Sequence, residues 1–475
     1  MSDDETIRST SPVRSAVRAT ADGEPRLAQA KKAYAFLVAF VAAVGGFLFG
    51  YDLHIITAGQ IFWRDFFQLT DAQFGFATSS AILGCIAGPF LGGWLADRFG
   101  RRGTLVFAGS LFGLSAIGTA LAQTIGLFNA FRITGGLGVG LASIASPMYI
   151  AEIAPARIRG RLGLMYQMAI TIGSTSAALV GYALSFGGHW RWMFGSMVVP
   201  VIAFIVFLCL VPESPRWLAE AGRSDQGLDV LTKIDGPEAA QKEMAEIKET
   251  LALEQGKYSE LFAPGFRLAL VIAVLLAFFN NLTGWSGIAY YLPVIFQKGG
   301  YADPSRAILN MLILNVFNMA FTLLCIWLVD RAGRRPLWIR ASIAMIFSLA
   351  FAGLAFQLKW TGPIIILVII FCTIPHHLGL GPLPWLMMSE LFPTRLRARG
   401  VALSTTVLWT GGFVGPMLFP IMAGVSEKMI GSIAGIFAVF AVICVFSLIF
   451  GLKLLPETKG RTLENIAKSW HTVGH

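Results

Sequence analysis

Long apolar runs recur along the whole chain, and they restrict its fold more than any other feature of the sequence. A helix needs about 20 apolar residues to cross a lipid bilayer, and each run is close to that length. Because the bilayer interior has no water to bind backbone polar groups, such runs fold as membrane-spanning helices. The runs cover residues 34–59, 73–95, 104–123, 127–151, 161–186, 190–211, 266–296, 305–329, 337–357, 362–391, 399–424 and 429–455.

The composition and the placement of charge agree with an integral membrane protein. Of the 475 residues, 55% are hydrophobic and only 13% are charged, whereas soluble domains carry about a quarter charged residues. The net charge of +10 alone would fit a nucleic-acid-binding protein, but Lys and Arg gather in short loops at 97–102, 156–161, 331–335 and 395–399. There they orient helices by the positive-inside rule. We therefore expect no nucleic-acid partner, and we place these loops and both termini in the cytoplasm.

The cysteines and the two ends of the chain add little chemistry. All five cysteines fall within apolar runs, where a thiol packs as a small apolar group, so we expect neither disulfides nor a metal site. The sequence contains no GxxxxGK[ST] phosphate loop, so we expect no ATP-driven step, no cofactor and no enzyme activity. Residues 1–33 lack the apolar core of a cleaved signal peptide. We predict disordered cytoplasmic tails over 1–33 and 461–475.

A charged hexapeptide occurs twice, as DRFGRR at 97–102 and as DRAGRR at 330–335. An acidic motif, in which a glutamate is followed by a proline three positions later and an arginine seven positions later, begins at Glu152 and again at Glu390. The sequence PES that begins at Pro212 is repeated as PET at Pro456. The two copies of each of the three motifs are separated by 233 to 244 residues. This ordered repeat predicts two homologous halves of six helices each. Since six is even, the halves run parallel, and transporters of this architecture bind substrate between the halves near the bilayer midplane.

The predicted halves, 34–221 and 262–460, are separated by a stretch of different composition. Residues 222–261 are rich in Lys, Glu, Asp and Gln, with apolar residues such as Leu228 and Leu231 at helical spacing. We predict a cytoplasmic linker of short amphipathic helices, and a solvated spacer without structure is the alternative. The predicted fold class is an all-α integral membrane protein with about twelve transmembrane helices in two parallel six-helix halves.

Several motifs resemble those of a known family. The GxxxDRxGRR sequence at 93–102 resembles the signature loop of the major facilitator superfamily. PESPRWL at 212–218, PETKG at 456–460 and the Glu152-x-x-Pro155-x-x-x-Arg159 pattern resemble motifs of its sugar porter branch. The resemblance covers residues 34–460. It implies a secondary transporter for sugars or sugar-like polyols that works by alternating access in the cell membrane, and we expect it to act as a monomer in the lipid bilayer.

The duplicated charged motifs are candidates for a gate at the cytoplasmic ends of the helices. An Asp and several Arg beside a glycine turn can pair with the next helix in one state and separate from it in another. Alternatively the arginines only set the topology. The candidate gate residues are Asp97, Arg98, Arg102, Glu152, Arg159 and Glu213 in the first half, and Asp330, Arg331, Arg334, Glu390, Arg397 and Glu457 in the second.

Two ionisable residues lie within predicted spans, where a charge is costly and indicates function. They are Asp52 in the first span and Arg132 in the fourth. The resemblance implies that Asp52 carries the proton in sugar porters that co-transport protons, with Arg132 as its partner. Movement of an arginine relative to a buried carboxylate changes the proton affinity of that carboxylate, so we expect proton symport. A permanent salt bridge that only fixes packing is the alternative.

Three histidines also fall within the spans. His54 lies two positions after Asp52 and therefore about 200° around the helix from it, so we give it a secondary place. His376 and His377 are adjacent in the tenth span. They line the cavity, bind a proton, or hydrogen-bond neighbouring helices, and the sequence favours the last of these.

Sugars present hydroxyl groups and an apolar C–H face, so a sugar site needs amides and aromatic rings. The fifth, seventh, tenth and eleventh spans supply both types. The resemblance implies a substrate site made of Gln167, Asn280, Asn281, Ser286, Tyr290, Trp385 and Trp409. Interhelical hydrogen bonding is the alternative role for each amide.

This candidate site departs from the family pattern. Asn280 and Asn281 stand where the family usually has two glutamines, Ser286 where it has an asparagine, and Ser174 where it has a second glutamine of the fifth span. The substrate is then larger, carries its hydroxyls in another arrangement, or leaves room for water. A facilitative uniporter and a non-transporting sugar sensor of the same fold are the alternative functions; Asp52 argues against the first, and the short C-terminal tail against the second.

Overall fold

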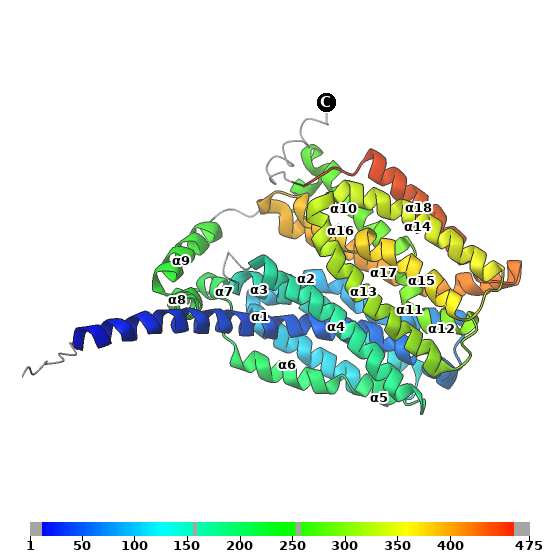
Figure 1. Cartoon of the computed structure of the whole chain (residues 1–475), viewed down its shortest axis with the longest axis horizontal. Coiled ribbons are helices and arrows are strands. Elements are labelled where there is room, and N and C mark those ends of the chain that lie inside the picture. Colours follow the sequence, from blue (N-terminus) through cyan, green and yellow to red (C-terminus); the bar gives the residue numbers. More distant parts are fainter. Residues whose placement is uncertain (1–11, 155–158, 253–257, 460–475) are drawn as a thin grey trace, which may run out of the picture.

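The computed structural model describes residues 12–154, 159–252 and 258–459, and every regular element within these ranges is a helix (Figure 1). Eleven of these helices are long and apolar enough to cross a membrane. The helix α2 (Asp71–Leu121) contains two such segments, because its backbone turns at Gly100, where φ is +83°. The described ranges therefore contain twelve crossings, which confirms the predicted all-α membrane fold.

The first six crossings form one bundle and the last six form another, on opposite sides of the molecule in Figure 1. The first bundle contains α1 (Pro12–Phe67), α2, α3 (Ile125–Ile153), α4 (Arg159–Ser185), α5 (Trp190–Gly195) and α6 (Val198–Leu210). The second contains α10 (Pro264–Leu282), α11 (Trp285–Tyr290), α12 (Leu292–Lys298), α13 (Pro304–Ala332), α14 (Arg334–Gln357), α15 (Pro363–Pro375), the π-helical turn η2 (His376–Leu380), α16 (Pro382–Glu390), α17 (Thr394–Ile430) and α18 (Ala434–Lys453).

Short helices connect the two bundles. They are α7 (Pro215–Glu220), α8 (Ser224–Asp235), α9 (Pro237–Ala252) and the 3₁₀ helix η1 (Tyr258–Phe262). Leu231, Ala240 and Met244 form a small core between α8 and α9 that is separate from the main core. The linker thus has the helical arrangement rather than the unstructured one.

The N-terminal segment differs from the sequence-based expectation. Helix α1 begins at Pro12, so residues 12–33 are helical where the sequence predicted a disordered tail. This segment is rich in Ala and in long straight side chains, which favour helix. The predicted tail over 461–475 lies outside the described residues.

The spans that contain glycine and proline behave differently from one another. The seventh crossing breaks at Gly284, whose φ is +101° and where a Cβ would lie 2.5 Å from the ring of Phe440. Gly381, Pro382 and Pro384 predict a break in the tenth crossing, and that crossing does break, at η2. Gly411, Gly412, Gly415 and Pro416 predict a break in the eleventh as well. This prediction is wrong, because α17 continues through Pro416 and Pro420, where neighbouring helices can satisfy the backbone groups that proline leaves free.

The two halves meet most closely at one end of the molecule. We call the end that carries the loops at 97–102 and 330–335 the motif end, and the opposite end the far end. At the far end the Ser185 hydroxyl donates to Ser305 at 2.9 Å, and the rings of Phe74 and Tyr291 lie 5.3 Å apart. A Cβ at Gly75 would overlap the backbone of Met417. The far end, on the right in Figure 1, is therefore closed.

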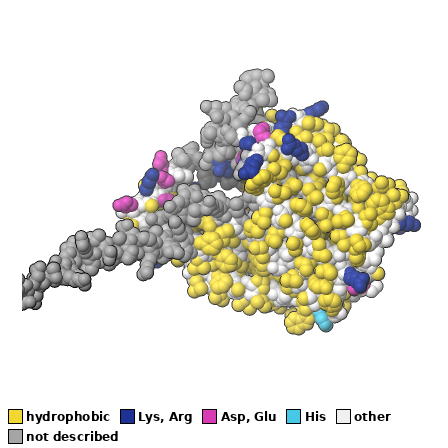
Figure 2. Space-filling view, viewed as in Figure 1, with side chains coloured by type: hydrophobic (Ala, Val, Ile, Leu, Met, Phe, Trp, Pro, Cys, Tyr) yellow, Lys and Arg dark blue, Asp and Glu magenta, His cyan; other side chains and the backbone are white. Residues whose placement is uncertain are grey.

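The outer surface is suited to lipid. Hydrophobic side chains cover most of the face drawn in Figure 2, and the charged side chains gather near its ends. Large side chains on the surface include those of Phe90, Trp94, Phe347 and Leu367. An apolar surface of this extent is stable in a bilayer and not in water.

The turn at Gly100 yields a first test. A Cβ at this position would lie 2.2 Å from Oε2 of Glu213, and φ of +83° with ψ of 167° is a conformation that only glycine adopts readily. Gly100→Ala should therefore lower the free energy of unfolding by about 1–3 kcal/mol, measured as a lower melting temperature in detergent. Gly103→Ala is the control, because its Cβ would have only an ordinary 3.5 Å contact; equal melting temperatures for the two variants would contradict this account.

Candidate functional site

Asp52 of α1 and Arg132 of α3 form an ion pair in the interior of the first half. Nη1 of Arg132 lies 2.7 Å from Oδ1 of Asp52, and Nη2 donates to the Asp52 carbonyl oxygen at 2.9 Å. Each side chain is only 1% exposed. The second carboxylate oxygen, Oδ2, and Nε of Arg132 have no partner among the described residues. The sequence predicted this pair, and its geometry leaves one carboxylate oxygen available to a proton.

Small residues allow the helices around this pair to approach closely. A Cβ at Gly135 would lie 2.4 Å from the Ser115 hydroxyl oxygen and 3.4 Å from Oδ1 of Asp52. A Cβ at Gly136 would lie 1.6 Å from the Ala81 carbonyl oxygen, and one at Gly140 would overlap Gly88. A glycine-rich run within an apolar span, such as 135–143, is typical of close helix packing, and it has that role here, since larger residues would push α3 away from α2.

At the motif end of the first half, Glu152 and Glu213 bind the loop at 97–102. Arg101 donates to Oε1 of Glu152 from Nη2 at 2.9 Å, and its Nε lies 2.8 Å from Oε2. The Ser214 hydroxyl donates to the same carboxylate. The Glu213 carboxylate accepts the backbone N–H groups of Arg101 at 3.0 Å and Arg102 at 3.1 Å. One loop is therefore tied to the ends of α3 and α6.

The second half repeats this arrangement contact by contact. Arg334 donates to Glu390 at 3.0 Å, and the Thr458 hydroxyl donates to the same carboxylate. Glu457 accepts the backbone N–H groups of Arg334 at 3.0 Å and Arg335 at 3.1 Å. The two networks occupy equivalent places in the two halves, which the repeated motifs of the sequence had indicated.

The remaining candidate gate residues have other surroundings. Arg102, expected in the ion-pair network, sends its guanidinium to the Val211 carbonyl oxygen at 3.1 Å, and its neighbour Arg101 binds Glu152 instead. Asp97 is largely exposed and lies 3.8 Å from Arg101. The guanidinium groups of Arg98 and Arg331 lie over the rings of Trp94 and Trp327, and Arg397 lies near the start of α17. The side chains of Arg159 and Asp330 lie outside the described residues.

The two candidate asparagines are engaged in bonds between helices. Nδ2 of Asn280 donates to the carbonyl oxygens of Leu380 at 3.0 Å and Gly381 at 2.8 Å, which joins α10 to the broken tenth crossing. Nδ2 of Asn281 donates to the Leu408 carbonyl oxygen of α17 at 2.8 Å. In this conformation the amide donors thus perform the interhelical role that the sequence left open as an alternative.

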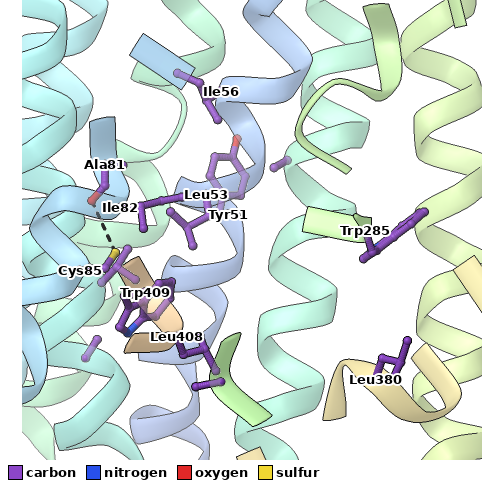
Figure 3. Close-up of a cluster of buried hydrophobic side chains, with 14 of the residues drawn as sticks. Tyr51, Leu53, Ile56, Ala81, Ile82, Cys85, Trp285, Leu380, Leu408 and Trp409 are labelled. Carbon is purple, nitrogen blue, oxygen red and sulfur yellow. Dashed lines mark hydrogen bonds between the residues drawn. The ribbon is translucent and has the colours of Figure 1, made fainter. Parts of the chain in front are cut away.

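Aromatic rings from both halves meet beside these asparagines. The ring centroids of Trp385 and Trp409 are 6.3 Å apart, and Phe49 of α1 lies 5.7 Å from Trp409. Trp385 is 42% exposed, whereas Trp409 is 6% exposed and its indole Nε1 has no partner among the described residues. In Figure 3, Trp409 lies close to Leu408 and well apart from Trp285. An exposed ring beside an unpaired indole N–H can stack on a sugar and donate to one hydroxyl.

The other candidate substrate residues lie on separate elements. Gln167 is exposed on α4, and Ser286 and Tyr290 lie on the short helix α11 between two breaks of the seventh crossing. Ser174 donates to the Thr171 carbonyl oxygen of its own helix at 2.9 Å. Phe49 and Arg101 also contact these sites, although the sequence did not predict them as site residues. Phe49 precedes Asp52 by nearly one turn, and a search for aromatic residues on the first span could have found it.

Comparison with known proteins places the chain in a family. The family described as "Sugar (and other) transporter" matches residues 38–470, so the chain belongs to this family. It is 36% identical to the arabinose-proton symporter of Bacillus subtilis (strain 168), over 92% of this chain and 95% of the relative. It is 34% identical to the D-xylose-proton symporter of Escherichia coli (strain K12), over 93% and 97%.

Solved structures confirm the major facilitator fold. The inward open conformation of the xylose transporter XylE from E. coli matches with a TM-score of 0.81 at 33% identity, covering 92% of this chain and all of that one. XylE bound to 6-bromo-6-deoxy-D-glucose matches with a TM-score of 0.75, over 92% and 99%.

Glu457 provides a test of the motif-end network. Burial alone would raise the pKa of this carboxyl group, but backbone N–H groups of four residues bind its charged form and hold the pKa below its ordinary value of 4.5. Its contribution to stability is therefore complete at neutral pH and is lost as the pH falls through the lowered pKa. Glu457→Gln should lower the melting temperature in detergent at pH 7, and the difference should shrink steadily below about pH 4.5.

A control separates this effect from general acid denaturation. Glu427→Gln removes a surface carboxylate that pairs with Lys298, and such pairs contribute only about 0–1 kcal/mol. If Glu427→Gln and Glu457→Gln lowered the melting temperature equally at pH 7, the backbone network around Glu457 would not have the role assigned to it.

Proposed function

We propose that this protein imports a sugar or a sugar-like polyol across the cell membrane by proton symport. The observation that carries the proposal is the buried pair of Asp52 and Arg132, with one carboxylate oxygen unpaired. Support also comes from the names of its relatives, the arabinose- and D-xylose-proton symporters, each covered almost completely. Transport proceeds by alternating exposure of a site between the halves.

Proton binding at Asp52 changes the forces between α1 and α3. A neutral carboxyl group interacts much more weakly with the Arg132 guanidinium than a carboxylate does. Loss of that attraction in a buried place leaves Arg132 uncompensated, which is costly, so protonation favours a rearrangement of α1 relative to α3. Helix α1 also carries Phe49, which contacts Trp409 of the second half. This contact connects the proton site with the substrate site.

The substrate lies, in this proposal, between the halves beside Trp385 and Trp409. Trp385 stacks on the apolar face of the ring, and Gln167, Ser286 and Tyr290 approach from α4 and α11. Asn280 and Asn281 hold the surrounding helices at the correct separation through their backbone bonds and offer their carbonyl oxygens to substrate hydroxyls. A single chain contains both halves of this site, so a monomer suffices.

The motif end faces the cytoplasm in this proposal, together with both termini. The conformation is then inward-facing, with the far end closed by the Ser185–Ser305 and Phe74–Tyr291 contacts. The networks of Glu152 and Glu390 each connect helices within one half. They keep each half rigid while the halves rock against each other, and they form the cytoplasmic gate with the loops they hold.

Asp52→Asn tests the coupling. The amide cannot exchange a proton, so uphill accumulation of radiolabelled sugar in proteoliposomes with an imposed proton gradient should fall to background. Counterflow exchange, which needs no net proton movement, should remain within a few-fold of the unmodified protein. Asp65→Asn is the matched control, because Asp65 is exposed on the same helix. Uphill uptake by Asp52→Asn that a protonophore abolishes would contradict the assignment of Asp52.

Asn281→Gln tests the substrate site. The longer amide restores the residue type common in the family and cannot keep the 2.8 Å bond to Leu408 without moving α17 or the substrate. We expect the native substrate to bind more weakly by about 1–3 kcal/mol, measured by calorimetry on purified protein. Gly103→Ala serves as a control remote from the site. Unchanged affinity in both Asn281→Gln and Asn281→Ala would show that Asn281 serves helix packing alone.

A further inference from the structure

His376 and His377 lie in the π-helical turn η2, and neither the coupling pair nor the aromatic site uses them. Their rings contact each other at 5.3 Å between centroids, and both contact the Trp285 indole, at 5.8 Å and 5.6 Å. The wider turn, closed by a bond from the Gly381 N–H to the His376 carbonyl oxygen at 2.8 Å, allows two consecutive side chains to face one tryptophan. Turns of this kind often occur at functional sites.

The contact of His377 with Thr322 favours one tautomer of its ring. The Thr322 hydroxyl of α13 donates to the Asn318 carbonyl oxygen at 2.8 Å, so its lone pair is what faces Nδ1 of His377 at 3.4 Å. Nδ1 therefore carries the hydrogen and donates. The other ring nitrogen, Nε2, is left with a lone pair, and it is buried without a partner among the described residues.

His54 of the first half is held in the same tautomer. Its Nδ1 lies 2.9 Å from the Gly50 carbonyl oxygen, which can only accept, so Nδ1 carries the hydrogen and Nε2 presents a lone pair. His54 and His377 are close enough to interact electrostatically although they belong to different halves. Nearby on α13, Oδ1 of Asn318 is a further buried acceptor without a partner among the described residues.

Buried acceptors on His377 and Asn318, which Thr322 connects, are therefore left without a donor among the described residues. A buried acceptor that lacks a donor costs about 1–3 kcal/mol, so a group of them is stable only if a ligand or water supplies O–H or N–H groups. The amide donors of Asn280 and Asn281 are already bound to backbone carbonyl oxygens. On α13, Nδ2 of Asn315 is itself buried without a partner among the described residues, and a hydroxyl group, which donates and accepts, can bind both kinds of atom. Trp285 adds an apolar ring surface against which C–H groups can pack.

We propose that His377 and His54, together with Asn318 and Trp285, form a subsite that accepts hydrogen bonds from hydroxyl groups of the substrate. The subsite is specific for donors, because imidazole lone pairs and an amide oxygen offer no hydrogen in return. His54 lies in the first half and the other three residues in the second, so a polyol bound here draws the halves together. The inference rests on the proposed sugar or polyol transport and identifies residues that select among such substrates.

A cycle of protein variants and substrate analogues tests this subsite. Purified full-length protein in detergent is titrated calorimetrically with L-arabinose, D-xylose, D-galactose and xylitol, and then with the monodeoxy analogues of the sugar that binds. His377→Leu should weaken the parent sugar roughly 5- to 150-fold. The analogue that lacks the hydroxyl group bound by His377 should bind the unmodified protein more weakly than the parent sugar does, by a similar factor. His377→Leu should bind this analogue and the parent sugar with equal affinity, because the variant has no acceptor for that hydroxyl group.

Two further variants keep the test decisive. His377→Gln retains an acceptor and should bind the parent sugar within a few-fold of the unmodified protein, whereas exposed His189→Leu should change nothing. If His377→Leu does not fold, His54→Leu is used in the same cycle, with the same loss of discrimination expected.

The outcomes separate the subsite from the proposed function. If a sugar binds the unmodified protein but His377→Leu weakens every analogue by the same factor, His377 acts only in packing and the subsite is overturned. If none of the four compounds binds the unmodified protein, the proposed substrate class is wrong, and so is the subsite. The buried Asp52 pair and the family assignment are not affected by this result.

Discussion

The ion pair of Asp52 and Arg132 is the interaction around which the rest of the structure is arranged. Two charges in the interior of a membrane bundle are stable only while they neutralise each other. Their 2.7 Å contact requires α1 and α3 to lie close together, and that in turn requires the glycines that let α3 approach α2. The packing of the first half thus depends on a buried contact between two opposite charges.

The motif-end networks explain how a local change at this contact can move large parts of the protein. Glu152 and Glu213 tie three crossings of the first half together, and Glu390 and Glu457 do the same in the second. Each half is thereby held together at its motif end. The contacts between the halves include a hydroxyl pair and aromatic rings at the far end and the ring contact of Phe49 with Trp409. Rigid halves joined by short-range contacts are suited to rocking.

The hydrogen bonds that the buried polar groups already make also determine which of these groups are free to bind a substrate. The asparagine donors of the seventh crossing bind backbone carbonyl oxygens. The Trp409 indole N–H, the His377 ring nitrogen and the Asn318 amide oxygen, by contrast, are among the buried polar atoms that have no partner in the part of the chain that the structure describes. A polyhydroxylated solute can satisfy both kinds, because each hydroxyl group donates and accepts. The replacement of the family glutamines by shorter asparagines therefore changes which residues are free to contact the solute.

The sequence by itself determined the membrane class, the twelve crossings, the duplication, and the pairing of Asp52 with Arg132, because apolar length and buried charge constrain a chain in a bilayer locally. It did not predict the helix at residues 12–33 or the unbroken helix α17. It also predicted Arg102 in the ion-pair network, where Arg101 is the residue that binds Glu152. These features depend on which neighbour satisfies a backbone group or a carboxylate. Only the tertiary structure decided that the Asn280 and Asn281 donors are occupied and that His376 and His377 both contact the Trp285 ring. Such outcomes depend on hydrogen-bond partners brought together from distant crossings, and no local pattern of residues records them.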